Sequence, residues 1–385
     1  MPGYELIGEE ERKEVNDVFD RGGILFRHGF DNLRKTYKVN RFEEEFSKFN
    51  NAKYGLAVTS GTAALRVALS ALDIGEGDEV ITQCFTFVAT VEAIVESGAL
   101  PKCCEIDKTL NICPIDLEKR ITEKTKAVIV VHMLGNPARL IEIQQICKKY
   151  NLFLIEDTAW GCGGKLNDKY LGTWGDIGTY SFDFAKTMTT GEGGMLIFKE
   201  KKYLQKAAAW HDHGHENNPN LPRWEDSRSS SGFNYRMMEL QGAIGLAQLK
   251  KLNKVIEMQR AISSKIWESI KDIDGVERRE LVPNAFETSD ALIFFLKTKE
   301  NASQCRNELL NNGLTTKILP EAFTWHFAGT WNHIKQLNFS HENKLDREFC
   351  FSRSLLNRAV SLPISYFFDL SNIKKIRSSI ISALK

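Results

Sequence analysis

Residues 181–194 read SFDFAKTMTTGEGG, a turn rich in Ser, Thr and Gly with Lys186 near its centre. Apolar, strand-like residues flank the turn at 178–182 and 195–198, so Lys186 does not belong to a charged helix face. A lysine in a polar turn between strands can lose enough hydration to act as an amine nucleophile and form a Schiff base. The glycines of the turn let the backbone bend tightly beside a ligand. The alternative is an ordinary solvated lysine on the surface.

Strand-like and helix-like segments alternate around this turn, over about 200 residues in total. The expected strands are 55–59, 79–82, 127–132, 153–155, 178–182 and 195–198, and the expected helices are 62–72, 88–97 and 140–150. Continuous apolar runs such as AVIVVH at 127–132 are typical of buried parallel strands. The pattern therefore predicts an α/β fold with a mostly parallel sheet that helices cover on both faces.

The pattern changes further along the chain, where residues 238–270 are expected to form one long helix. It then restarts with the strand-like run ALIFFL at 291–296, a helical stretch at 304–311 and a terminal helix at 371–384. We therefore expect three parts: an N-terminal arm at 1–22, a large α/β domain at 23–250 and a smaller C-terminal α+β domain at 251–385. The arm is expected to pack with the smaller domain.

Charge and hydropathy exclude several classes of protein. The chain has 51 Lys and Arg against 50 Asp and Glu, a net charge of +1 that argues against a nucleic-acid partner. No apolar run approaches the roughly 20 residues of a membrane span, and the first residues, MPGYELIGEEERKEV, lack the order of a signal peptide. We expect a cytoplasmic protein without a membrane partner, with a sizeable core from its 42% hydrophobic residues.

The eight cysteines indicate neither a disulfide scaffold nor a zinc site. Cys103 and Cys104 are adjacent, the others are scattered, and no paired CxxC spacing occurs. A chain of this length also builds its core without disulfides. We expect buried free thiols.

Three further motifs lie at the ends of expected elements, where a ligand site can form. Ser60-Gly61-Thr62 stands between a strand and a helix, so its backbone N–H groups suit a phosphate, although Ser60 also suits a plain helix cap. Asp157 ends the strand LFLIED at the sheet edge where open α/β sheets bind ligands, or is a solvated strand end or a cap. Asn234 precedes the helix of GFNYRMMELQGAIG, whose small residues permit close packing with or without a ligand.

Together, these motifs resemble the DegT/DnrJ/StrS family of sugar aminotransferases, from roughly Gly23 to the C-terminus. The segments that carry the resemblance are SGTAAL, CFTFVATVEAI, VVHMLGNPA, IEDTAWGCGG, SFDFAKTMTTGEGG and GFNYRMMELQGAIG. The resemblance implies a pyridoxal 5'-phosphate (PLP) enzyme of fold type I, the aspartate aminotransferase-like fold.

The resemblance also implies roles for individual residues. Lys186 would hold PLP as a Schiff base and move the proton, and Asp157 would pair with the pyridine nitrogen, which makes the ring an electron sink. Phe87 would stack on the ring. The phosphate would be bound by Ser60, Gly61, Thr62 and Ser181. Asn234 would reach the phosphate of the partner subunit's cofactor, which implies a homodimer with shared active sites.

Trp160 departs from the family pattern. The family often has Gln at this position, three residues after the aspartate, where it contacts the ring hydroxyl of the cofactor. Either another donor replaces that hydrogen bond here, or the environment of the hydroxyl differs. Lys186 argues against the dehydratases of the family, which carry His at the lysine position.

Three segments resemble a narrower branch of the family: FRHGFD (26–31), HDHGHENN (211–218) and TWHFAGTWNHI (324–334). That branch makes 8-amino-3,8-dideoxy-manno-octulosonate by aminating an 8-oxo sugar acid, a lipopolysaccharide precursor without a nucleotide. A sugar acid needs a cationic partner, and a guanidinium is the best geometric match. The candidate substrate residues are Arg27, His213, His215 and His326, with His211 as a further donor.

These candidates have alternatives. Arg27 could form an exposed salt bridge on the charged N-terminal arm. The alternating histidines at 211, 213 and 215 are compatible with zinc, although we expect a substrate or subunit-contact loop and no metal.

The sequence thus predicts an aminotransferase with two half-reactions. L-glutamate would donate its amino group to PLP, and the loaded cofactor would aminate an oxo-sugar, with 8-oxo-3-deoxy-manno-octulosonate as the first candidate. A nucleotide-linked keto-deoxyhexose is the alternative acceptor. A protein of another class, a non-catalytic PLP-binding regulator, would keep the fold without turnover.

Overall fold

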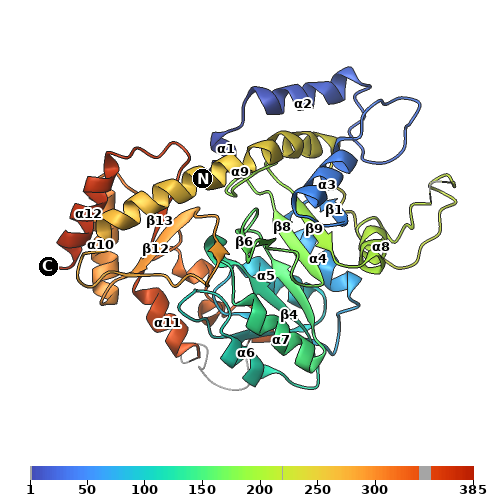
Figure 1. The fold of residues 1–385 in the computed structure, drawn as a ribbon. Coiled ribbons are helices and arrows are strands. Elements are labelled where there is room, and N and C mark those ends of the chain that lie inside the picture. Colours follow the sequence, from blue (N-terminus) through green and yellow to red (C-terminus); the bar gives the residue numbers. More distant parts are fainter. Residues whose placement is uncertain (1, 219, 338–347) are drawn as a thin grey trace.

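The computed structural model describes residues 2–218, 220–337 and 348–385. A seven-stranded sheet forms the centre of its larger part (Figure 1), in the order β1-β9-β8-β5-β4-β2-β3. The strands are β1 (Tyr54–Val58), β2 (Glu79–Gln83), β3 (Leu100–Cys104), β4 (Thr125–Val131), β5 (Phe153–Asp157), β8 (Ile177–Ser181) and β9 (Gly194–Phe198). Only β9 runs antiparallel to its neighbours, so the mostly parallel α/β sheet expected from the sequence is confirmed.

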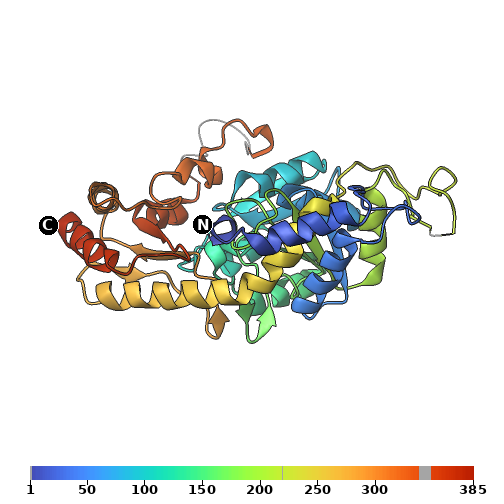
Figure 2. The same ribbon diagram turned by 90° about the horizontal axis from the view of Figure 1, so that it is seen from above.

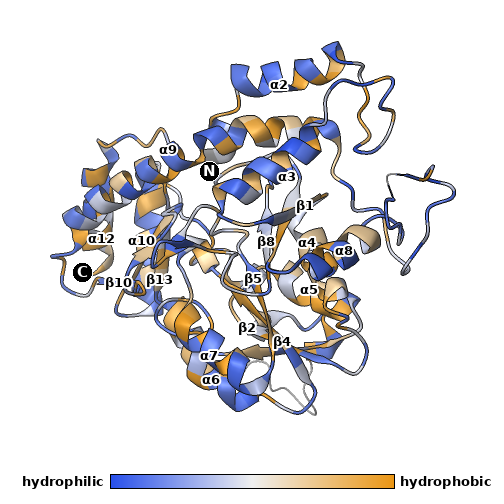
Figure 3. Cartoon of the chain, turned by 45° about the vertical axis from the view of Figure 1, so that its right-hand side comes forward, coloured by the Kyte–Doolittle hydropathy of each residue, from blue (hydrophilic) through white to orange (hydrophobic). Residues whose placement is uncertain are grey.

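Helices cover both faces of this sheet. One face carries α4 (Gly61–Ala71), α5 (Val88–Glu96) and α8 (Lys201–Trp210), and the other carries α3 (Lys38–Phe49), α6 (Pro114–Arg120) and α7 (Leu140–Tyr150). Along β1, Leu56 packs against the face that carries α4 and α8, and Ala57 packs against the face that carries α3, because successive strand residues point to opposite faces. Hydropathy colouring shows apolar central strands and polar outer faces of the helices (Figure 3).

A smaller antiparallel sheet lies beside the large one, with the order β10-β12-β13. Its strands are β10 (Glu277–Arg278), β12 (Ala291–Phe295) and β13 (Ala359–Pro363), and its helices are α10 (Lys299–Asn311), α11 (Cys350–Asn357) and α12 (Asn372–Ala383). A third small sheet contains β6 (Lys165–Leu166), β7 (Lys169–Tyr170) and β11 (Ala285–Phe286). Short 3-10 turns lie at Met133–Gly135, Phe323–Trp325, Ala328–Thr330 and Lys335–Leu337.

One long helix, α9 (Glu239–Ile270), joins the two larger sheets (Figures 1 and 2). Its first half packs against α3 at Gly242 and Gly245, where a Cβ atom would lie 2.7 Å from the backbone of Val39 and 2.6 Å from the ring of Phe42. Its second half contributes Ile262 and Ile266 to the core of the smaller sheet. The expected boundary after residue 250 therefore falls inside a continuous helix, and we propose that both domains share α9.

The N-terminal arm contacts both parts of the molecule. Its helix α2 (Glu9–Asp20) lies along α9, where Glu11 pairs with Lys251 at 2.8 Å. Its first turn, α1 (Pro2–Glu5), reaches the smaller domain, where Glu5 accepts a hydrogen bond of 2.9 Å from Ser365. Glu5 of α1 shows the expected packing with the smaller domain, whereas α2 packs on the middle of α9, on both sides of the expected boundary at residue 250.

Two further observations bear on expectations from the sequence. None of the helices in the described ranges is long and apolar enough to cross a membrane. All eight cysteines are free and six of them are buried, namely Cys84, Cys103, Cys104, Cys147, Cys162 and Cys305.

Candidate active site

A cavity of about 560 Å³ opens at the carboxyl ends of β5 and β8, between the large sheet and the smaller domain. It brings together residues that are far apart in the sequence. The sequence-predicted residues that line it are Ser60, Gly61, Thr62, Phe87, Asp157, Trp160, Ser181, Lys186 and His326. The predicted residues outside it are Asn234, Arg27, His213 and His215.

Lys186 presents its amine to this cavity from the loop between β8 and β9. Its Nζ lies 3.4 Å from the ring centroid of Trp160 and makes no hydrogen bond to any residue in the described part of the chain. Burial, together with the positive charge of Lys317, lowers the pKa of Lys186 from 10.5 to about 8. The neutral, nucleophilic form of the amine is therefore a minor fraction at pH 7 and reaches half near pH 8, far below the pH at which an ordinary lysine loses its proton.

Asp157 ends β5 and lies in the same cavity. Its Oδ1 accepts a hydrogen bond of 3.2 Å from the Ala159 N–H, and its Oδ2 accepts one of 2.9 Å from the Thr90 hydroxyl. Thr90 in turn shares a 2.8 Å hydrogen bond with Thr86. Burial raises the pKa of Asp157, so a cationic ring nitrogen would be a favourable partner for this carboxylate. The sequence had not singled out Thr90, although it lies one turn after Thr86 within the motif CFTFVATVEAI.

The N-terminus of α4 forms one end of the cavity. Ser60 caps the helix, because its Oγ accepts a hydrogen bond of 3.0 Å from the Ala63 N–H. Ser60 is thus a helix cap, and this role leaves the other backbone N–H groups of the first turn available for a phosphate. A Cβ atom on Gly61 would lie 2.7 Å from Cβ of Ser181, so only glycine lets the helix start this close to β8. The result is a helix N-terminus rimmed by hydroxyl groups, which suits an anion.

Phe87 and His326 form the opposite wall. The Phe87 ring is 43% exposed and lies 5.6 Å from the ring of His326. The backbone N–H of Thr86 donates a hydrogen bond of 2.9 Å to the carbonyl oxygen of His326, which fixes the segment from the smaller domain against the large one. Burial, together with the charges of Lys186 and Lys317, lowers the pKa of His326 to about 4, so its imidazole is neutral near pH 7.

These side chains fit pyridoxal phosphate. Lys186 supplies an amine, Asp157 a buried carboxylate and Phe87 an exposed aromatic face, and the α4 N-terminus suits a phosphate. When bound, the cofactor supplies an electron sink at the substrate carbon. Lys186 would supply the base, and Asp157 the carboxylate that holds the ring nitrogen's proton.

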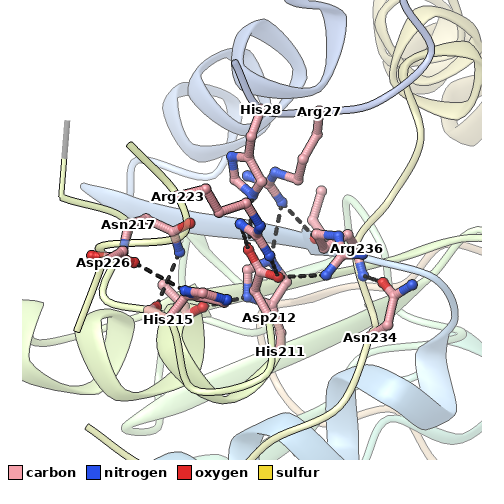
Figure 4. Close-up of polar contacts among 12 residues, drawn as sticks. Arg27, His28, His211, Asp212, His215, Asn217, Arg223, Asp226, Asn234 and Arg236 are labelled. Carbon is pink, nitrogen blue, oxygen red and sulfur yellow. Dashed lines mark hydrogen bonds and ion pairs between the residues drawn. The ribbon is translucent and has the colours of Figure 1, made fainter. Parts of the chain in front are cut away.

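Asn234 lies outside this cavity, on the exposed loop between α8 and α9 (Figure 4). This loop extends away from the body of the molecule (Figure 2). Asp212 organises it, because this buried carboxylate accepts hydrogen bonds from Arg223 at 2.8 Å and from Arg236. Burial opposes ionisation of Asp212, but His28 and the two arginines outweigh it and hold its pKa well below the usual range.

Arg27 lies beneath the same loop and does not line the cavity of its own chain. Its guanidinium pairs with Glu43 at 2.7 Å, donates to the Ala57 carbonyl at 3.1 Å and lies 3.3 Å from His211. It is only 5% exposed, so the alternative of an exposed salt bridge is wrong. Arg27 is buried because β1 and α3 together supply acceptors for it.

The three histidines of the loop, at 211, 213 and 215, have different partners and do not form one cluster. His215 pairs with Asp226 at 3.2 Å, His211 lies against Arg27, and the His213 N–H donates to the Phe233 carbonyl at 3.2 Å. Among the residues that the structure describes, no group of three or more metal-ligating side chains could hold a metal ion.

The fold and this set of side chains define a pyridoxal-phosphate-dependent aminotransferase. A sequence profile of the DegT/DnrJ/EryC1/StrS aminotransferase family matches residues 6–381, and the chain belongs to this family. This confirms the family resemblance and the fold that the sequence motifs implied.

Several known proteins are similar to the chain. GDP-perosamine synthase of Escherichia coli O157:H7 is 35% identical over 320 residues, which cover 82% of this chain and 84% of that protein. GDP-perosamine synthase of Vibrio cholerae is 38% identical over 265 residues, covering 68% and 69%. The solved structure of an aminotransferase from Psychrobacter cryohalolentis has a TM-score of 0.84 at 25% identity and covers 98% of this chain and 96% of its own.

Proposed function

We propose that this enzyme transfers the amino group of L-glutamate to an oxo-sugar, as a homodimer with shared active sites. The observation that carries the proposal is the single cavity in which the Lys186 amine, the Asp157 carboxylate and the α4 N-terminus meet. Membership of the aminotransferase family and the similarity to two GDP-perosamine synthases support a sugar acceptor.

Lys186 is proposed to act as the base. A neutral amine can take the proton from the substrate carbon as a base, and the resulting ammonium can donate it again later in the reaction. An amine with a pKa of about 8 can serve in both roles near neutral pH. The Nζ of Lys186 lies over the indole face of Trp160, and it makes no competing hydrogen bond to a residue in the described ranges. Thr90 and the Ala159 N–H keep the Asp157 carboxylate oriented toward the ring nitrogen.

The shared site rests on the loop that carries Asn234. Asn234 does not reach the cavity of its own chain, and it lies close to Arg236, whose N–H donates to its Oδ1 at 3.3 Å. In a homodimer this protruding loop is proposed to place Asn234 at the phosphate of the partner subunit's cofactor. Arg27 and His215 lie in the same region (Figure 4), and the backbone of His213 bonds to Phe233 of the same loop. Substrate contacts by these three residues would therefore also require the second subunit.

The first candidate acceptor is 8-oxo-3-deoxy-manno-octulosonate, which would give 8-amino-3,8-dideoxy-manno-octulosonate for lipopolysaccharide. The segments FRHGFD, HDHGHENN and TWHFAGTWNHI support it, and the last of these places His326 in the cavity. The second candidate is a nucleotide-linked keto-deoxyhexose, which the names of the two GDP-perosamine synthases favour.

A two-stage assay tests the proposal. The holoenzyme is first mixed with L-glutamate alone, and the visible absorbance of the cofactor and the release of 2-oxoglutarate are followed. Each oxo-sugar is then added and the amino-sugar is detected by mass spectrometry. We expect turnover with wild type and none with Lys186→Ala, which also lacks a borohydride-reducible bond to the cofactor. Asp157→Ala should keep that bond but lose most turnover.

The outcomes separate the alternatives. An unchanged absorbance with glutamate would favour the non-catalytic regulator. Amination of the nucleotide-linked sugar with no activity on the sugar acid would overturn the first acceptor and leave the reaction type standing.

A further inference from the structure

Lys317 enters the active-site cavity from the smaller domain, at a position the sequence motifs did not indicate. Its Nζ lies 4.5 Å from the ring centroid of Trp160, the same indole that the Lys186 amine contacts at 3.4 Å. It pairs with Asp290 at 2.6 Å, and its side chain keeps 10% exposure toward the cavity. Two lysine amines therefore border one aromatic ring in the pocket.

The backbone holds Lys317 in place through a strained turn. The next residue, Ile318, has a φ of +72°, a conformation that a β-branched residue rarely adopts. The N–H of Leu319 donates to the carbonyl oxygen of Lys317 at 2.9 Å, which closes a tight three-residue turn. The N–H of Lys317 itself donates to Ser361 of β13 at 2.8 Å. Strain of this kind persists where the surrounding structure enforces it and is concentrated at functional sites.

The ammonium of Lys317 still has hydrogen-bonding capacity. A lysine ammonium has three N–H donors, and Asp290 is the single hydrogen-bond acceptor for Nζ among the residues in the described ranges. Asp290 is 1% exposed as a side chain, and its carboxylate fixes the position of the Lys317 ammonium. The remaining donors face a cavity whose other polar groups include the Lys186 amine and the neutral imidazole of His326.

We propose that Lys317 binds the α-carboxylate of the amino donor during the first half-reaction. The proposal rests on the proposed function, because it assigns a subsite within the same cavity. A carboxylate beside Lys317 is favoured by the charge of its ammonium, and a direct ammonium–carboxylate hydrogen bond fixes the orientation of the donor.

The position of Lys317 favours the donor over the acceptor as the source of that carboxylate. The α-carboxylate of an amino acid is attached to the carbon that carries the reacting nitrogen. In an 8-oxo octulosonic acid, the carboxylate and the reacting carbon lie at opposite ends of the sugar. Because the Lys186 and Lys317 amines contact the same indole ring, Lys317 lies near the reacting nitrogen, as the first geometry requires.

Three amino donors test this assignment in the absence of any sugar. L-glutamate carries both carboxylates, L-glutamine lacks the side-chain carboxylate, and L-isoglutamine lacks the α-carboxylate. The single-turnover reaction of each donor with the holoenzyme is followed by cofactor absorbance. Lys317→Met should weaken apparent binding of glutamate and of glutamine by roughly 10- to 100-fold, and should leave the weaker binding of isoglutamine almost unchanged.

Matched variants control for charge and folding. Lys317→Arg should restore most of the binding, because it keeps the cation. Lys206→Met removes an equivalent charge from a surface pair with Asp73 and should change nothing. Because Lys317→Met leaves Asp290 buried and unpaired, the double variant Lys317→Met/Asp290→Asn is measured as well, with thermal unfolding of each holoenzyme.

The result that overturns the proposal is equally specific. An equal loss for all three donors would show that Lys317 acts only on Lys186, and an increase confined to the KM of the sugar acid would assign the subsite to the acceptor. Failure to aminate any sugar, with these donor effects intact, would overturn the proposed acceptor and not the subsite.

Discussion

The amine of Lys186 shows, at the scale of a single residue, how burial prepares a nucleophile. Its pKa of about 8, against an ordinary value of 10.5, follows from burial and from the charge of Lys317. A lowered pKa means that the neutral amine, which attacks the cofactor aldehyde, is populated above about pH 8.

We therefore predict that the rate at which cofactor-free protein attaches PLP rises with pH, reaches half its maximum near pH 8 and is level above it. Lys317→Met should move the midpoint upward, because a neighbouring positive charge is removed. Stopped-flow absorbance over a pH series measures both. A wild-type midpoint near 10.5 would contradict the buried amine.

Arg27 gives a second prediction at this scale. Because Arg27 pairs with Glu43 inside the protein, Arg27→Ala leaves a buried carboxylate without its cation. We expect a loss of about 3 kcal/mol in the free energy of unfolding, and partial recovery in Arg27→Ala/Glu43→Gln. Urea unfolding of the wild-type holoenzyme and of the two variants measures this. Unchanged stability with a raised KM for the sugar alone would instead support direct contact with substrate.

At the scale of elements, the close approach of α4 to β8 forms the end of the cavity that we propose to hold the phosphate. Gly61→Ala would place Cβ 2.7 Å from Cβ of Ser181, although alanine favours helix more than glycine does. The strain of overpacking, about 1–3 kcal/mol, should appear as a roughly 10- to 100-fold weaker affinity for PLP.

Equilibrium dialysis of PLP against cofactor-free protein measures that affinity. Gly75→Ala is the matched control. Its Cβ would lie 3.4 Å from the nearest atom, the carbonyl oxygen of Ser97, and Gly75 does not line the cavity. Equal affinities for the two variants would mean that the α4 N-terminus does not hold the phosphate.

At the scale of the whole molecule, the cavity combines two domains, and the proposed homodimer adds a third contribution. Lys186 comes from the large domain and Lys317 from the smaller one, whereas Asn234 lies on a loop that does not reach either within the chain. A shared site predicts that variants in different subunits complement each other.

We predict that Lys186→Ala and Asn234→Ala homodimers, mixed under conditions that exchange subunits, regain activity above the sum of the two alone. In the mixed dimer, one site combines an intact Lys186 with an intact Asn234 from the other subunit. Asn234→Ala alone should weaken cofactor retention. A fully active monomer at assay concentration, shown by analytical ultracentrifugation, would refute the shared site.

Much of the large domain could be predicted from the sequence, because buried parallel strands and amphipathic helices leave local periodic patterns. The helix at Leu140–Tyr150 was predicted to the residue. The strand β3 was missed, since it lies at the sheet edge and reads LPKCC, with a proline, a lysine and no continuous apolar run.

The same local logic determined the cofactor side of the cavity. Asp157 and Ser181 end parallel strands and Ser60 precedes a helix, and the carboxyl ends of parallel strands meet at one edge of the sheet. Their proximity therefore follows from the order of elements alone. Lys186 could be placed beside them because its Ser-, Thr- and Gly-rich turn directly follows Ser181 in the sequence.

Only the tertiary structure decided where Lys317 and Arg27 lie. Lys317 joins the cavity because a strained turn and the β13 strand carry it across the domain junction, and Arg27 leaves the surface because Glu43 and Ala57 offer it acceptors. Neither contact has a local pattern, since each joins residues that are distant in the chain. A long flexible cation can find its partner in many places, and which partner it meets depends on the packing of the whole fold.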